Sequence, residues 1–277
     1  MIIQKGIYPE GKKKCLIFSY DDDMADNAMI IDLFRKYGIR GTFNFNGSGL
    51  LEDGAEQKER PQLYKSQLPA IDDEFEVACH GYVHPPYGYM DAAQCADDVI
   101  RDRRTLEAIL HHPVRGLALP SGVYSKETLQ ILRACGIAYC RTIECTGGFE
   151  LPTDFMEWHP TAKHDDFDKL FAAGEAYLKG SWRLNNYLSC MLIYGHSYEM
   201  AADARRQKLE EFLQMMAGRE DIWYATCMEL YSYLSALDQL IMTVDGTCVI
   251  NPTLTDVWVR ANGEAVCIPA GQTKRFD

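Results

Sequence analysis

Three consecutive aspartates, Asp21, Asp22 and Asp23, end an apolar, strand-like run that begins at Cys15. A strand that carries carboxylates only at its C-terminal end delivers them to the edge where parallel α/β barrels and open sheets keep their active sites. Adjacent like charges repel one another, and a divalent cation removes that repulsion by taking carboxylate oxygens as ligands. The alternative is an acidic loop in which Asp22 or Asp23 caps the following helix.

Two histidines four residues apart, His80 and His84, directly follow another strand-like run. Both imidazoles fall on one side of a single turn and can share one ion, while Pro85 keeps that turn from extending into a long helix. Gly81 stands where the helical zinc-protease motif requires Glu. A chance spacing is the alternative, but beside an acidic strand end the pair predicts a site of two His and one Asp with open coordination positions.

A third histidine, His196, ends a further strand-like run and follows Gly195, which permits a close approach of the backbone. A lone histidine at a strand end is more often a hydrogen-bonded structural residue. At the active face of a hydrolytic metal site, however, it has a role as proton donor to the leaving group.

These residues need a parallel sheet to bring them together, and strand-like runs alternate with amphipathic helices along the chain. The pattern predicts an α/β fold, a distorted seven-unit (β/α) barrel with a small C-terminal β appendage. The expected strands are 15–20, 41–46, 75–79, 114–119, 137–143, 189–194 and 222–225, and the expected helices are 27–37, 61–68, 91–110, 126–135, 165–178, 202–216 and 226–237.

The final segment breaks the alternation, because short runs there are separated by turn sequences such as Asp245-Gly246 and Asn262-Gly263. We therefore expect a barrel over residues 1–237 and a small β-hairpin appendage over 238–277.

Composition narrows the possible partners. The chain has 277 residues, 47% of them hydrophobic, and a net charge of −12, which argues against nucleic acid and anionic membranes because phosphate binding needs clustered Lys and Arg. No stretch is long enough to span a membrane and the first residues lack a signal peptide, so we expect a cytoplasmic protein. Ten cysteines without a CxxC pair predict reduced thiols. The oligomeric state stays open.

Four motifs, in this order, resemble those of the polysaccharide deacetylase family, which includes chitin and peptidoglycan deacetylases. They are Ser19-Tyr-Asp21-Asp22-Asp23, His80-Gly-Tyr-Val-His84, Leu119-Pro-Ser-Gly122 and Ile193-Tyr-Gly-His196. The resemblance covers roughly residues 12 to 235. It implies a hydrolase that removes acetyl groups from amino sugars or related N-acyl substrates with a divalent metal, for which zinc is our first expectation.

The resemblance also implies a role for each matched residue. Asp21 corresponds to the general base and His196 to the general acid, while the backbone N–H of Ser121 corresponds to an oxyanion donor. The implied metal ligands are Asp22, His80 and His84. The metal would lower the pKa of its water and polarise the acyl carbonyl.

The chain departs from the family in its third and fourth motifs. Ala118 and Ser121 stand at the Arg and aromatic positions of the third motif, so the Arg that normally pairs with the base is missing. Arg141 ends the fifth expected strand and can supply that charge to Asp21; a surface arginine is the alternative. The fourth, Asp-rich motif is not evident. In its region we expect Trp158 and His164, together with Ser121 and Tyr124, to contact the substrate.

The predicted function is a metal-dependent hydrolase that removes acetyl groups from an N-acetylated or O-acetylated carbohydrate or another N-acetylated small molecule. One alternative is a cyclic-amide hydrolase of the allantoinase type, which often lacks the full set of metal ligands that this chain retains. The other is a carbohydrate-binding protein with impaired catalysis, which Ala118 and Ser121 would suit. Binding alone does not require both Asp21 and His196, so we rank that alternative last.

Overall fold

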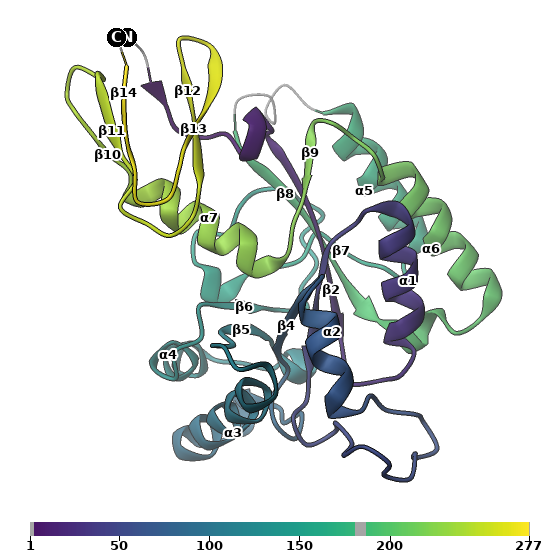
Figure 1. Cartoon of the computed structure of the whole chain (residues 1–277). Coiled ribbons are helices and arrows are strands. Elements are labelled where there is room, and N and C mark those ends of the chain that lie inside the picture. The colour runs from purple at the N-terminus through teal and green to yellow at the C-terminus, as the bar shows by residue number, and fades with distance from the viewer. Residues whose placement is uncertain (1–2, 181–186, 277) are drawn as a thin grey trace.

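A curled parallel sheet forms the centre of the molecule (Figure 1), in a computed structural model that describes residues 3–180 and 187–276. The strand order is β6-β5-β4-β3-β2-β8-β7, and β9 pairs with the start of β2. The strands are β2 (Lys14–Asp21), β3 (Gly41–Phe45), β4 (Glu76–Cys79), β5 (Gly116–Ala118), β6 (Tyr139–Arg141), β7 (Ala162–Lys163), β8 (Ser189–His196) and β9 (Ile222–Tyr224). The fold is a distorted (β/α) barrel.

Helices follow the strands and cover the outside of the sheet, with α1, α5 and α6 along one flank and α2, α3 and α4 along another (Figure 1). They are α1 (Asn27–Tyr37), α2 (Leu68–Asp72), α3 (Ala92–Leu110), α4 (Lys126–Ala134), α5 (Phe167–Lys179), α6 (Asp203–Met216) and α7 (Cys227–Gln239). None of the helices in the described part of the chain combines the length and apolarity that crossing a membrane requires.

An extended segment, 158–164, links the two edges of the sheet. Trp158 pairs with Arg141 on β6, and its N–H donates to Cys140 O over 3.0 Å. Further along, Thr161 N donates to Leu192 O on β8 over 2.7 Å. The same short segment therefore bonds to β6 at one edge of the sheet and to β8 near the other edge, where it forms the edge strand β7.

The alternation of side chains along β2 decides which of them face the barrel interior. Leu16 and Phe18 pack in the cluster that includes the helices, whereas Cys15 and Ile17 belong to a second, inner cluster. Successive strand residues point to opposite faces. Asp21 therefore continues the inward series and lies at the carboxyl end of the interior.

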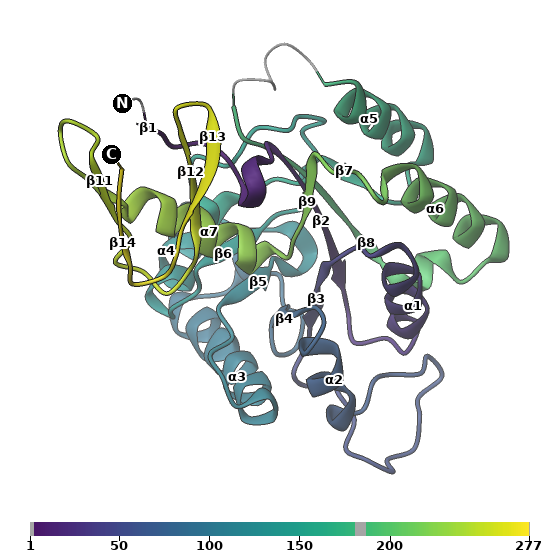
Figure 2. The same cartoon turned by 45° about the horizontal axis from the view of Figure 1, so that its top comes forward.

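The other end of the interior is covered by α7, which lies between the barrel and the C-terminal strands (Figure 2). Its first turn is held by the barrel. Met228 N donates to Glu76 Oε2 over 2.8 Å, and the other oxygen of Glu76 accepts from the Tyr139 hydroxyl over 2.7 Å. An anionic side chain at a helix N-terminus also suits the helix dipole.

Two small antiparallel sheets pack on α7 beside the N- and C-terminal ends of the chain (Figure 1). One contains β1, β12 and β13, and the other β10, β11 and β14. Their bounds are β1 (Ile3–Gln4), β10 (Ile241–Met242), β11 (Cys248–Ile250), β12 (Val257–Ala261), β13 (Glu264–Ile268) and β14 (Thr273–Arg275). The N-terminal strand thus joins strands from the far end of the chain. The domain division at residue 237 stays a prediction.

The helix expected over 61–68 is wrong in position, since α2 begins only at Leu68. Pro69 lies in its first turn, where a missing N–H costs nothing and the fixed φ favours a helix start. Residues before it instead form the long connection from β3, which pairs through isolated bridges such as Met24 with Gln62. The strands β1, β7 and β14 were not predicted, because runs of two or three residues carry no detectable period.

Candidate active site

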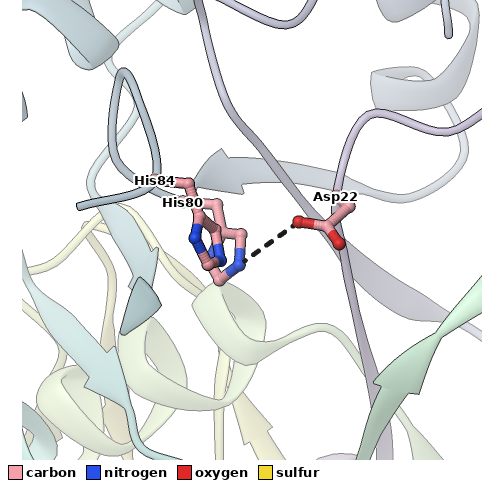
Figure 3. A group of neighbouring side chains, drawn as sticks. All are labelled: Asp22, His80 and His84. Carbon is pink, nitrogen blue, oxygen red and sulfur yellow. Dashed lines mark ion pairs between the residues drawn. The ribbon is translucent and has the colours of Figure 1, made fainter. Parts of the chain in front are cut away.

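A group of three potential ligands lies at the carboxyl ends of β2 and β4 (Figure 3). One ligand atom from each of Asp22, His80 and His84 lies within 4.8 Å of the others. His80 Nε2 is 3.7 Å from Asp22 Oδ1, His80 is buried, and His84 is exposed. The group therefore opens to solvent on one side.

The backbone at two of these residues is held in the left-handed region, with φ of 74° at Asp22 and 56° at His84. Such a conformation costs a non-glycine residue about 1–2 kcal/mol and persists only where neighbouring contacts fix it. The Asn27 side chain supplies one such contact by donating to Asp22 O over 2.8 Å.

The hydrogen bond of His80 defines which ring nitrogen is free. His80 Nδ1 lies 2.9 Å from Ala118 O, and since a carbonyl can only accept, Nδ1 carries the proton and Nε2 presents a lone pair toward Asp22. Burial lowers the pKa of His80 against the opposing effect of Asp21 and Asp22, which favours the neutral, ligating form. Two imidazoles and one carboxylate fit a divalent ion such as zinc.

Two aspartates on α3 hold the turn that carries the histidines. Charge on an amphipathic helix normally marks its solvent face, but here Asp98 is 5% and Asp102 0% exposed. Asp98 accepts from Tyr82 N over 2.8 Å and from Val83 N over 3.2 Å. Asp102 accepts from His80 N over 3.0 Å. Burial raises the pKa of Asp102 to about 8, opposed by donation from backbone N–H groups.

Asp21 is held by an arginine at the end of β6. Arg141 Nη2 donates to Asp21 Oδ1, Asn44 Nδ2 donates to the same oxygen over 3.0 Å, and both Asp21 and Arg141 are buried. The Arg141 guanidinium also lies 4.8 Å from the centre of the Tyr194 ring. Burial raises the pKa of Asp21, but the charge and hydrogen bond of Arg141 oppose that effect, and the pKa lies below its ordinary value.

His196 is oriented by a carboxylate three residues further on, in a short 3₁₀ helix over Ser197–Met200. Glu199 Oε2 accepts from His196 N over 3.1 Å and lies 3.2 Å from His196 Nδ1. Burial alone lowers the pKa of His196, but Glu199 and Asp21 raise it above its ordinary value. Lys163 Nζ donates to the other oxygen of Glu199 over 2.5 Å.

Residues 9–140 match the family described as polysaccharide deacetylase. The matched part of the chain, which runs from the residues before β2 into β6, is similar to that family. No curated protein matches the chain by sequence.

Solved structures share the fold of this chain. A proposed polysaccharide deacetylase from Mycobacterium smegmatis is 14% identical with a TM-score of 0.61, covering 85% of this chain and 94% of its own. Puue allantoinase is 14% identical with a TM-score of 0.63, covering 81% and 91%. A family 4 carbohydrate esterase from Streptomyces lividans, solved with acetate, is 14% identical with a TM-score of 0.50, covering 76% and 91%.

His164 does not line a substrate pocket, contrary to our expectation. It is fully buried, with Nδ1 2.9 Å from the Tyr20 hydroxyl and Nε2 2.8 Å from Glu199 Oε2. A Cβ at Gly195 would come within 2.0 Å of the His164 ring, so this ring is what approaches the glycine. His164 therefore acts on Glu199 and only through it on His196.

Trp158 was also expected to contact the substrate, and the structure does not place it at a surface where it could do so. It is 2% exposed and packs edge-on against Tyr139 and Phe155 in the inner cluster. Its strand pairing with β6 points the side chain into the core, where it has no surface to offer a substrate.

Ser121 and Tyr124 lie in and after the 3₁₀ turn Pro120–Gly122 that follows β5. Ser121 is exposed with φ of 58°, and the Tyr124 hydroxyl donates to Glu157 Oε1 over 2.6 Å. The oxyanion role of Ser121 N–H and the substrate contact of Tyr124 stay predictions.

Sequence reasoning missed Asp98, Asp102 and Glu199. A signal existed for each. The two aspartates are spaced i, i+4 in the helix after the histidine motif and so share one helix face, and Glu199 follows His196 at the spacing of one turn.

Proposed function

We propose that this protein is a metal-dependent hydrolase that removes acetyl groups from an N-acetylated or O-acetylated carbohydrate. The observation that carries the proposal is the juxtaposition of three elements at one barrel end. A two-His, one-Asp group lies beside a buried Asp21 fixed by Arg141 and a His196 fixed by Glu199.

Asp21 acts as the general base through one defined oxygen. Arg141 and Asn44 both donate to Oδ1, which leaves Oδ2 free, and Oδ2 lies 4.0 Å from His80 Nε2. A water held between Asp21 and the histidines can therefore pass its proton to Oδ2 as it attacks the acetyl carbonyl. The pKa of Asp21, lowered by Arg141 against burial, keeps it ionised for this step.

His196 acts as the general acid. Its Nδ1 faces Glu199, which leaves Nε2 to donate a proton to the departing amine or alcohol. Because Glu199 raises the pKa of His196 against burial, the imidazolium form needed for donation extends to higher pH.

A divalent ion would be held by Asp22, His80 and His84 and would supply Lewis-acid polarisation of the carbonyl and activation of water. The protein residues that move protons lie around that group and are separate from its ligands.

The fold shared with an allantoinase motivates a second substrate in the assay, because a cyclic amide presents the same kind of bond. Retention of all three candidate ligands favours the metal-dependent deacetylase. A protein that only binds carbohydrate would not need Asp21 paired with Arg141 or His196 paired with Glu199.

The test is metal content and acetate release measured on the same samples. Wild-type protein loaded with zinc is assayed on N-acetylglucosamine oligomers, O-acetylated xylan and allantoin. The exposed His84 is replaced in His84→Ala, which should lose stoichiometric metal and acetate release together, and His111→Asn serves as a control at an exposed histidine outside the site. Unchanged metal content in His84→Ala, or ring opening of allantoin without acetate release, would contradict the proposal.

A further inference from the structure

Tyr198 lies beside the candidate general acid, His196, and also beside the side chain of Arg60. The Tyr198 ring lies 5.2 Å from the His196 ring, centre to centre, at an angle of 33°. Arg60 is distant from Tyr198 in the sequence, but its guanidinium carbon lies 5.3 Å from the centre of the Tyr198 ring. The Tyr198 ring therefore lies close to both His196 and Arg60.

Arg60 belongs to the long connection between β3 and α2, which projects past the end of α1 at the lower edge of Figure 1. This connection is fixed locally by a reciprocal pair, because Gln57 Nε2 donates to Gln62 O over 3.0 Å and Gln57 Oε1 accepts from Gln62 N over 2.8 Å. The pair clamps the residues between them, Arg60 included, into one turn.

Hydrogen bonds also anchor this loop to the residues beside Asp22, a candidate metal ligand. Gln62 Nε2 donates to Asp23 Oδ2 over 2.7 Å, Leu63 N donates to Asp23 O over 2.8 Å, and Ala25 N donates to Pro61 O over 2.9 Å. The loop is thus bonded to the residues that directly follow β2. Arg60 reaches from there toward the loop that follows β8.

The charge of Arg60 is available to a ligand. Arg60 is exposed, and among the ion pairs formed within residues 3–180 and 187–276 none includes it. Stacking on Tyr198 directs the guanidinium without neutralising it. A planar guanidinium in this position matches the oxygens of a carboxylate or phosphate.

We propose that Tyr198 and Arg60 form a subsite for an anionic substituent on the leaving-group side of the acetylated sugar. The inference rests on the proposed function, since it takes His196 as the donor to the departing amine. The sugar that carries this amine then lies along Tyr198, and a carboxylate or phosphate on it meets Arg60. The preferred substrate class is an acetylated amino sugar bearing an acidic group.

The test compares matched anionic and neutral sugars. Acetate release and calorimetric binding are measured for N-acetylmuramic acid, its uncharged methyl amide and N-acetylglucosamine 6-phosphate. Wild-type protein should favour the acid over the amide about five- to tenfold in kcat/KM and in affinity, as expected for a charge-assisted contact at a partly exposed site. The preference should weaken as salt is raised. A larger preference for the phosphate than for the acid identifies phosphate as the recognised group.

Arg60→Ala should bring the acid-to-amide ratio toward one, whereas Arg60→Lys should keep part of it. Arg104→Ala, at an exposed arginine on α3, changes the net charge equally and should keep the wild-type ratio. Tyr198→Leu should reduce the ratio and Tyr198→Phe should not, because only the ring supports Arg60.

The binding measurement separates this inference from the proposed reaction. If no sugar is hydrolysed but the acid still binds more tightly than the amide through Arg60, the reaction is wrong and the subsite stands. If acetate is released and the ratio is the same in Arg60→Ala as in wild type, the subsite is wrong and the reaction stands. Equal wild-type binding of acid, amide and phosphate also overturns the subsite.

Discussion

Asp21 is ionised next to a second carboxylate, Asp22, and the arginine that permits this comes from an unusual position. Like charges at close range push one carboxylate toward protonation, and Arg141 opposes this from the end of β6. The third-motif position that would supply an arginine holds Ala118, whose carbonyl instead accepts from His80. Charge and geometry at the base therefore depend on Arg141.

Arg141→Lys should keep the metal and lower turnover. Lysine retains a positive charge but cannot reproduce the directed contacts that the guanidinium makes with Asp21 and with Thr142 O. The loss should be about ten- to a hundredfold in kcat, typical of a misaligned base, and the acidic limb of the pH profile should move upward because Asp21 is less well stabilised as an anion. Unaltered kcat together with an unshifted acidic limb would disprove this role.

Glu199→Gln should move the alkaline limb of the pH profile to lower pH. His196 must be protonated to donate, and its pKa lies above the ordinary value because Glu199 and Asp21 outweigh the effect of burial. Removing the Glu199 charge lowers that pKa, so the protonated fraction is lost earlier as pH rises. Acetate release followed from pH 5 to 10 measures the shift.

The matched control for this change is Glu210→Gln, which removes a carboxylate bonded to Lys36 on the surface. It should leave both limbs in place. An alkaline limb that stays put in Glu199→Gln would mean that another group is the acid.

The sequence predicted Arg141 but not Glu199, for a physical reason. Arg141 is the last residue of the buried strand β6, so the local sequence pattern predicts that its side chain lies at the carboxyl end of the sheet. The position of Glu199 is fixed by His164 and Lys163, which the segment 158–164 brings across from another part of the chain. Pattern along one stretch does not contain that contact.

At the level of elements, α3 positions the turn that carries His80 and His84 although it contributes no candidate ligand. Asp98 accepts two backbone N–H groups of the turn and the Tyr87 hydroxyl. Buried donors left without an acceptor cost about 1–3 kcal/mol. The His84 conformation, with φ of 56°, depends on a turn fixed in this way.

Asp98→Ala should therefore weaken zinc binding while leaving all three ligands in the chain. We expect at least a tenfold loss of affinity by competition with a chelator, and a fall of about 1–3 kcal/mol in the free energy of unfolding. Asp97→Ala removes the exposed neighbouring carboxylate and should change neither quantity. A stable Asp98→Ala protein with wild-type zinc affinity would show that α3 does not set the turn.

Helices and strands could largely be predicted from the sequence where they are long enough to show a regular apolar pattern. The expected helix 27–37 coincides with α1, and the expected strand at 15–20 lies within β2. Inward-facing acids on a helix were not predictable from amphipathicity, because charge normally marks the solvent face. Asp98 and Asp102 break that rule because the turn that carries His80 and His84 offers backbone N–H donors, which only the tertiary structure brings near.

For the whole molecule, the two ends of the barrel have separate tasks. The candidate chemistry lies at the carboxyl ends of the strands, whereas α7 and the small sheets close the opposite end. The Tyr233 hydroxyl joins them by donating to Ile7 O over 2.7 Å and accepting from Trp258 N over 3.1 Å. The appendage therefore shares the inner cluster and contributes none of the candidate site residues.

Deletion of residues 241–276 should lower stability and spare the chemistry of the molecules that remain folded. The deleted strands bury Val257, Val259 and Ile268 completely against α7, and each such side chain contributes about 1.5–3 kcal/mol. The melting temperature should fall markedly, while zinc per folded molecule and the pH limbs of acetate release stay as in the full chain. Leu254→Ser, at an exposed position of the same segment, should leave the melting temperature unchanged. If the shortened chain folds but binds no zinc, the appendage shapes the active site from a distance and the two ends of the barrel are coupled.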